Sequence, residues 1–120
     1  MPSKKPERRL LDIVENAKAI AGYVEGFDAK AFGGDAKTRD AVERCLQRIS
    51  EAAVKLGDEA ERLIPSQPWK QIRSFGNVLR HQYDIINAAE SWIMASEQVP
   101  QLAEDCQNAI SRLKMGFSES

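Results

Sequence analysis

Apolar residues recur along this chain at intervals of three and four, and nowhere in the strict alternation that is typical of a half-buried strand. One such stripe lies between about Pro6 and Val24 and consists of Leu10, Ile13, Val14, Ala17, Ile20 and Ala21. A second covers about Lys37 to Leu56, and Gly57 is placed to end that helix. The periodicity therefore predicts an all-α protein.

The remaining segments extend this pattern. A short turn is expected around residues 27–32, within a glycine-rich connection, and a short helical piece is expected at residues 58–64, before a proline-rich one. Longer helices are expected over about residues 68–82, 84–98 and 100–114, the last one opened by a proline. Together these elements predict an up-and-down bundle of four to five helices.

Length and composition favour a single domain over residues 1–120. A chain of 120 residues suits one hydrophobic core, expected at about residues 7–114, with 1–6 and 115–120 frayed. No run approaches the roughly 20 apolar residues that span a bilayer, and no apolar stretch follows the basic N-terminus, so neither a membrane segment nor a signal peptide is expected. Cys45 and Cys106 lack metal-ligand or redox spacing, which predicts reduced, buried thiols in a cytoplasm.

Charge and motif content exclude several classes of protein. The net charge of −1 argues against a surface that coats nucleic acid, so any contact with RNA must be local. One histidine cannot build an ordinary zinc site, and the chain has no glycine-rich phosphate loop. No metal and no cofactor is expected.

That single histidine, His81, lies in the segment with the most informative chemistry. Arg80 precedes it, Asn77 lies one helical turn earlier, and Tyr83 follows two residues later. An imidazole with an ordinary pKa of about 6.5 exchanges protons near neutrality, and a guanidinium can hold a phosphate through two parallel hydrogen bonds. These groups suit phosphodiester cleavage, although acid–base work on a phosphodiester usually needs two proton carriers.

A helical projection of residues 69–84 separates two faces. Ile72, Phe75 and Leu79 are expected in the core, and a polar face carries Lys70, Arg73, Asn77, Arg80, His81 and Asp84. The plain alternative is a solvated face, which every bundle helix has. Gly76, in mid-helix, costs about 1 kcal/mol relative to alanine, and close approach of another subunit or of a phosphate would explain it.

Several motifs follow one another along the chain: Arg-Leu-Leu-Asp at 9–12, Thr-Arg-Asp-Ala-Val-Glu-Arg at 38–44 with Ile-Ser-Glu-Ala-Ala at 49–53, Pro-Trp-Lys-Gln-Ile at 68–72, Asn77 with His81-Gln82-Tyr83, and Trp92 with Val-Pro-Gln-Leu at 99–102. In this order and at these distances they resemble the HEPN superfamily, specifically the HepT-like toxins that are paired with a minimal nucleotidyltransferase antitoxin.

The resemblance implies a metal-independent endoribonuclease toxin that works as a twofold homodimer. His81 and its copy would serve as base and acid, with Asn77 beside them, and the product would carry a 2′,3′-cyclic phosphate. Arg80 and Arg73 would stabilise the developing charge, and together with Lys70 they would bind the RNA phosphates.

Two further residues have expected roles. The resemblance implies that Tyr83 is the hydroxyl to which the partner nucleotidyltransferase transfers AMP, as an electrostatic off-switch. Glu51, on the helix expected to pack beside the motif, is a candidate to orient His81 or to pair with Arg80.

One departure from the family pattern keeps alternatives open. The family arginine that precedes the asparagine is replaced here by Gly76, so the phosphate-binding guanidinium must come from Arg80 or Arg73, or be missing. The rival hypothesis is a catalytically inactive protein of the same fold that binds a nucleotide or a partner. A purely structural bundle protein is a third possibility.

Overall fold

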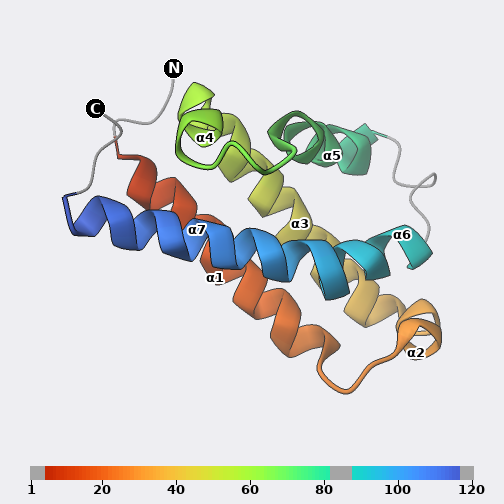
Figure 1. Cartoon of the computed structure of the whole chain (residues 1–120). Helices are drawn as coiled ribbons and strands as arrows, with labels where there is room; N and C mark the ends of the chain where they lie inside the picture. Colours follow the sequence, from red (N-terminus) through yellow and green to blue (C-terminus); the bar gives the residue numbers. More distant parts are fainter. Residues whose placement is uncertain (1–4, 82–87, 117–120) are drawn as a thin grey trace.

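The computed structural model describes residues 5–81 and 88–116, with the side chains of 5–76 and 88–116. Its helices are α1 (Pro6–Val24), α2 (Ala29–Gly33), α3 (Ala36–Leu56), α4 (Asp58–Leu63), α5 (Trp69–His81), α6 (Ala88–Ile93), the π-helical segment η1 (Met94–Gln98) and α7 (Val99–Lys114) (Figure 1). Within these described ranges no strand occurs. The predicted all-α bundle is confirmed.

Helix boundaries follow local capping chemistry. Asp35 accepts a hydrogen bond from the Thr38 N–H at 3.1 Å and so satisfies one of the free donors at the start of α3. Asp28 does the same for α2 through the N–H of Ala31, at 2.8 Å. Gly57 ends α3 with a φ of +58°, a conformation that favours glycine. The ends of α1 and α3 therefore lie where the sequence predicts them, within one residue.

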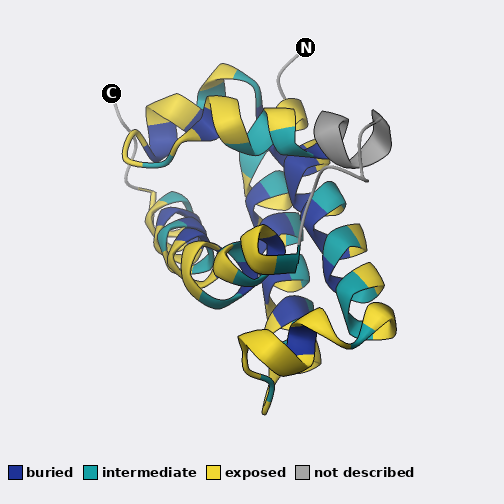
Figure 2. Ribbon diagram, turned by 90° about the vertical axis from the view of Figure 1, so that its right-hand side faces the viewer, coloured by how far each residue is buried: buried dark blue, intermediate teal, exposed yellow. Residues whose placement is uncertain are grey.

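The core is built around α1, which packs along both α3 and α7 (Figure 1). Each helix turns its buried side inward, as the dark blue faces in Figure 2 show. The largest fully buried side chains are Trp69, Phe32, Leu10, Ile13, Ile20 and Leu56. The predicted stripe on α1 is buried except for Ala21, which is exposed.

The C-terminal helices differ from the prediction. Separate helices before and after residue 99 were expected, whereas α6, η1 and α7 form one continuous helical run from Ala88 to Lys114. The N–H of Val99 donates to the carbonyl of Met94, five residues back, so the helix is widened immediately before Pro100. Proline lacks an N–H and crowds the preceding turn of an α-helix, and the wider turn accommodates it without a break.

Both cysteines are free and buried, which confirms the predicted buried thiols. Burial raises the pKa of Cys106 to about 12 and also raises that of Cys45. Among the described helices, none is both long and apolar enough to cross a bilayer.

The start of α5 is fixed to its neighbours at two points. The buried indole of Trp69 donates from Nε1 to the carbonyl of Ile64 at 2.7 Å. Just before the helix, the Gln67 amide donates to Asp105 Oδ2 of α7 at 2.7 Å. The helix that carries the predicted site is therefore anchored at its first turn, and α3 supports it further along.

Candidate functional site

Helix α5 lies antiparallel to α3, and their contact is ordered along the sequence. Arg73 reaches the C-terminal end of α3 at Ala53 and Gly57, whereas Gly76, one turn later, meets Ser50, one turn earlier on α3. The remaining turn of α5, residues 77–81, continues in the same direction and carries the histidine.

Arg73 is engaged in a cluster of contacts within the chain. Its guanidinium donates to both carboxylate oxygens of Glu61 (2.8 Å to Oε2) and to the carbonyls of Gly57 at 2.9 Å and Ala53 at 3.4 Å. The hydrogen bond to Arg73 lowers the pKa of Glu61, and the same bond raises the pKa of Arg73. The last carbonyls of a helix have no partner within it, and Arg73 supplies one for α3. That Arg73 contacts a phosphate stays a prediction. The hydrogen bonds described here count against it, because Arg73 would have to give them up to reach a phosphate.

Gly76 is buried where α5 crosses α3. Its N–H donates to Ser50 Oγ at 2.9 Å, and Ser50 Oγ donates in turn to the carbonyl of Arg73 at 2.8 Å. The structure gives Gly76 a close neighbour within its own chain, helix α3. The predicted second subunit or phosphate beside Gly76 stays a prediction.

The other predicted site residues fall at the C-terminal end of α5 and beyond it. Asn77, Arg80 and His81 belong to its last turns, but their side chains lie outside the described part of the chain. Tyr83 also lies outside the described residues. Glu51 is exposed on α3 directly after Ser50, on a helix that packs against α5 as predicted. The roles assigned to these five residues stay predictions.

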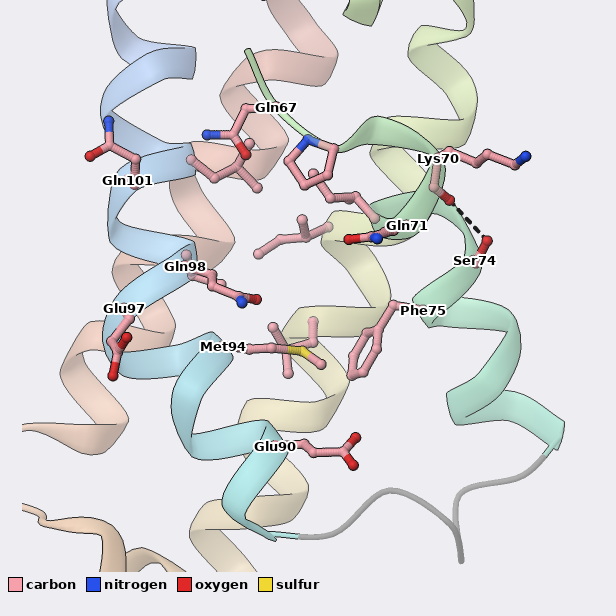
Figure 3. A pocket seen from close by; sticks show the side chains of 16 residues that line it. Gln67, Lys70, Gln71, Ser74, Phe75, Glu90, Met94, Glu97, Gln98 and Gln101 are labelled. Carbon is pink, nitrogen blue, oxygen red and sulfur yellow. Dashed lines mark hydrogen bonds between the residues drawn. The ribbon is translucent and has the colours of Figure 1, made fainter.

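A groove of about 930 Å³ opens beside this helix (Figure 3). Residues from α5 form one wall, residues from α6, η1 and α7 form the other, and Leu46 and Ile49 of α3 lie at its floor. Phe75 and Met94 project toward each other across it (Figure 3). Ile72 and Phe75, which the sequence assigned to the core, are half-buried and line this groove, because no helix of the described chain covers that side of α5.

The rim of the groove is polar, and its two walls differ in charge. Exposed Lys70 lies on the α5 wall, and exposed Glu97 lies on the opposite wall. The amide side chains of Gln67, Gln71, Gln98 and Gln101 also line the groove. Sequence reasoning missed this groove, because the spacing of apolar residues does not show which helix pairs leave a gap.

Comparison with known proteins gives one family. The model of the family described as "Ribonuclease HepT-like" matches residues 13–109, which include all of α5. A Methanocaldococcus jannaschii protein named "Putative RNase MJ0127" is 31% identical over 95% of this chain and 94% of its own length. A Thermococcus cleftensis protein named "Probable ribonuclease HepT" is 30% identical over 78% of this chain and 84% of its own length. No solved structure gives a significant match.

The pairing of Arg73 with Glu61 generates a prediction about stability and pH. The bond to Arg73 holds the pKa of Glu61 below its ordinary value of 4.5, so the stability it contributes is present above that value and is lost as pH falls through the lowered pKa. We therefore expect thermal unfolding to show a lower Tm for Glu61→Gln than for the unmodified chain at neutral pH, with the gap closing in acid. Because the pair is partly exposed, high salt should also narrow the gap.

Glu15→Gln, on the exposed side of α1, is the matched control and should leave the Tm unchanged at both pH values. A difference in Tm between Glu61→Gln and the unmodified chain that stays constant as pH falls would contradict a stabilising pair between Arg73 and the ionised Glu61.

Proposed function

The chain belongs to the HepT-like ribonuclease family, and on this premise we propose that it is a metal-independent endoribonuclease, the toxin of a toxin–antitoxin pair. The observation that carries the proposal is the family match over 13–109, which includes α5 and the only histidine of the chain. The names of the similar proteins, an RNase and a HepT ribonuclease, support the same activity. Two free, buried cysteines fit the reducing cytoplasm, where we place this activity.

The chemistry we propose is a transesterification that releases the downstream RNA fragment through its 5′ oxygen. The His81 imidazole removes the proton of a ribose 2′-hydroxyl, whose oxygen forms a bond to phosphorus. The bond from phosphorus to the 5′ oxygen then breaks, and the His81 imidazole of a second copy protonates that leaving oxygen. One fragment ends in a 2′,3′-cyclic phosphate and the other in a 5′-hydroxyl. DNA, which has no 2′-hydroxyl, is not a substrate.

For the phosphate-binding guanidinium we favour Arg80 over Arg73. Arg73 would have to leave Glu61 and two carbonyls of α3 to reach a phosphate, at the expense of the hydrogen bonds that fix α5. Lys70 is exposed on α5, but in the dimer proposed below it faces Glu97 of the second copy, so the phosphate contact is left to Arg80. Asn77 would hold the substrate beside His81, and Glu51 would orient the imidazole from α3.

The second candidate is a protein of the same family without catalysis. A specific observation favours it. The position of the family arginine is occupied by the buried Gly76, and Arg73, the nearest arginine in the sequence whose side chain is described, is already paired with Glu61. Such a protein would bind a nucleotide or a partner and would not cleave RNA even at a molar excess over substrate.

The groove supports association of two copies of the chain. Its apolar lining is unpaired within the described chain, and α5 contributes both this lining and the histidine. In a twofold contact every pair of residues occurs twice, so a dimer that we propose to place Lys70 opposite Glu97 of the second copy forms this ion pair at both ends. The opposite charges of the two walls make the groove self-complementary.

We further propose that a minimal nucleotidyltransferase silences this protein by transferring AMP to Tyr83. Added phosphate would bring negative charge next to the guanidinium of Arg80 and would compete with RNA.

Cleavage of an RNA pool by purified protein, in a chelator, tests the ribonuclease proposal. We expect His81→Ala to lower the cleavage rate by about 10²- to 10⁴-fold, because it removes both proton carriers of the dimer. The circular dichroism spectrum and Tm should stay close to those of the unmodified chain. Products with 2′,3′-cyclic ends are expected, whereas a folded, unmodified dimer that cleaves nothing would favour the binding protein.

The two arginines are separated by a paired experiment. Arg80→Ala should lower cleavage at nearly unchanged Tm, whereas Arg73→Ala should lower the Tm first, because it leaves Glu61 and the end of α3 without their partner. The reverse pattern would indicate that Arg73, and not Arg80, binds the phosphate.

Charge reversal across the groove tests the dimer. Lys70→Glu and Glu97→Lys should each raise the dimer dissociation constant about tenfold, because each places like charges opposite one another. The double variant should restore it, and sedimentation at graded concentration measures all three. Lys18→Glu, on the exposed side of α1, is the control. Single variants that dimerise normally would place the interface elsewhere.

Modification is tested by incubating the protein with a nucleotidyltransferase of this type and ATP. We expect a mass increase of one AMP on the unmodified chain, loss of RNA cleavage, and neither effect in Tyr83→Phe. Modification that persists in Tyr83→Phe would reject this residue as the acceptor.

A further inference from the structure

Ser50 is a buried polar residue that connects α3 to the backbone of α5. Ser50 is only 2% exposed. Its hydroxyl makes two hydrogen bonds, and both go to backbone groups of α5. Oγ accepts from the Gly76 N–H at 2.9 Å and donates to the Arg73 carbonyl at 2.8 Å. A serine hydroxyl offers one donor and two acceptor sites, and both kinds are used here.

These two backbone groups belong to the hydrogen-bond ladder of α5. In a regular α-helix the Gly76 N–H donates to the carbonyl of Ile72, and the Arg73 carbonyl accepts from the N–H of Asn77. The Ser50 hydroxyl therefore enters the ladder at the turn that leads directly into residues 77–81. The bond between the Gly76 N–H and Ser50 Oγ is the last hydrogen bond between α3 and α5 that the structure describes before residues 77–81.

The residue that donates to Ser50 is a glycine. Gly76 is buried and has no side chain, and its backbone N–H lies within hydrogen-bonding distance of a short side chain on α3. Ser50 and Gly76 thus form a matched pair, which gives the glycine a role at the position where the family has an arginine.

We propose that Ser50 is a positioning residue for the reaction, fixing the rotation and height of the His81 turn on α3 through the backbone of Arg73 and Gly76. The proposal rests on the ribonuclease function proposed above. Without the hydroxyl, the Gly76 N–H can donate to the Ile72 carbonyl as in any regular α-helix, so we expect the helix itself to survive. What is lost is the fixed register of the His81 turn relative to α3, and therefore relative to the second copy.

The reaction is sensitive to such a change, since a misplacement of about 1 Å can lower a rate by about 10²-fold. We expect Ser50→Ala to lower kcat by about 10- to 100-fold while KM changes less than about threefold, because no group that binds RNA is removed. Ser50→Thr, which keeps the hydroxyl, should restore most of kcat. If the extra methyl prevents folding, Ser50→Cys serves instead: its thiol has a similar size but is a weak hydrogen-bonding group, so its kcat should match that of Ser50→Ala.

The single histidine gives a readout that does not depend on cleavage. The ring-proton NMR signals of His81 are the only imidazole signals of the chain, and we expect them to move in Ser50→Ala and to return in Ser50→Thr. Ser96→Ala is the matched control: its hydroxyl donates to the Trp92 carbonyl within its own helical run, at 2.7 Å, so neither kcat nor the His81 signals should change.

The outcomes separate the two proposals. Unchanged His81 signals in folded Ser50→Ala, or a loss of kcat no larger than its loss of folded protein, would overturn the positioning role. An unmodified chain that cleaves no RNA, but whose His81 signals move in Ser50→Ala, would overturn the ribonuclease and leave the link between α3 and the His81 turn standing.

Discussion

The contact between α3 and α5 is the interaction on which the rest of this structure depends. It is made largely through backbone groups: Ser50 binds two of them on α5, and Arg73 binds two carbonyls on α3. Contacts of this kind fix the register of two helices more narrowly than apolar packing, because each bond is lost over a fraction of an ångström. The turn that carries His81 is the direct continuation of this contact along α5.

The same contact explains how positive charge is distributed on α5. Arg73 is directed to the carbonyl end of α3 and to Glu61, and it donates to the carbonyls of Ala53 and Gly57 and to the Glu61 carboxylate. Position 76 is enclosed by Ser50 and carries no side chain. In the ribonuclease that we propose, the phosphate contact is thereby left to Arg80, and the family's arrangement of one arginine before the asparagine is not reproduced. Family membership and the identity of the phosphate-binding group are therefore separate questions in this chain.

On its other side α5 faces the groove, because the run from α6 to α7 diverges from it. That run stays helical through Pro100 by widening at η1, and its Met94 and Glu97 form the wall opposite Phe75 and Lys70. One helix thus has two functional sides: one fixed to α3 through backbone hydrogen bonds, and one apolar and open. A second copy seated in the groove would couple dimerisation to the chemistry, since both use the same 13-residue helix.

The sequence by itself determined the helices, because apolar spacing, aspartate caps and Gly57 act over a few residues: α1 and α3 begin and end where predicted. It also determined the family, since the order of motifs along the chain survives without knowledge of their contacts. Only the tertiary structure decided that Arg73 pairs with Glu61, that Ser50 meets Gly76, and that Ile72 and Phe75 line a groove. The two pairings join residues 12 and 26 positions apart in the sequence, and the groove is a gap between helices. Both kinds of feature depend on the angle at which two helices cross and on how far one is shifted along the other. A periodic pattern states which face of a helix is apolar, but it does not state what that face meets.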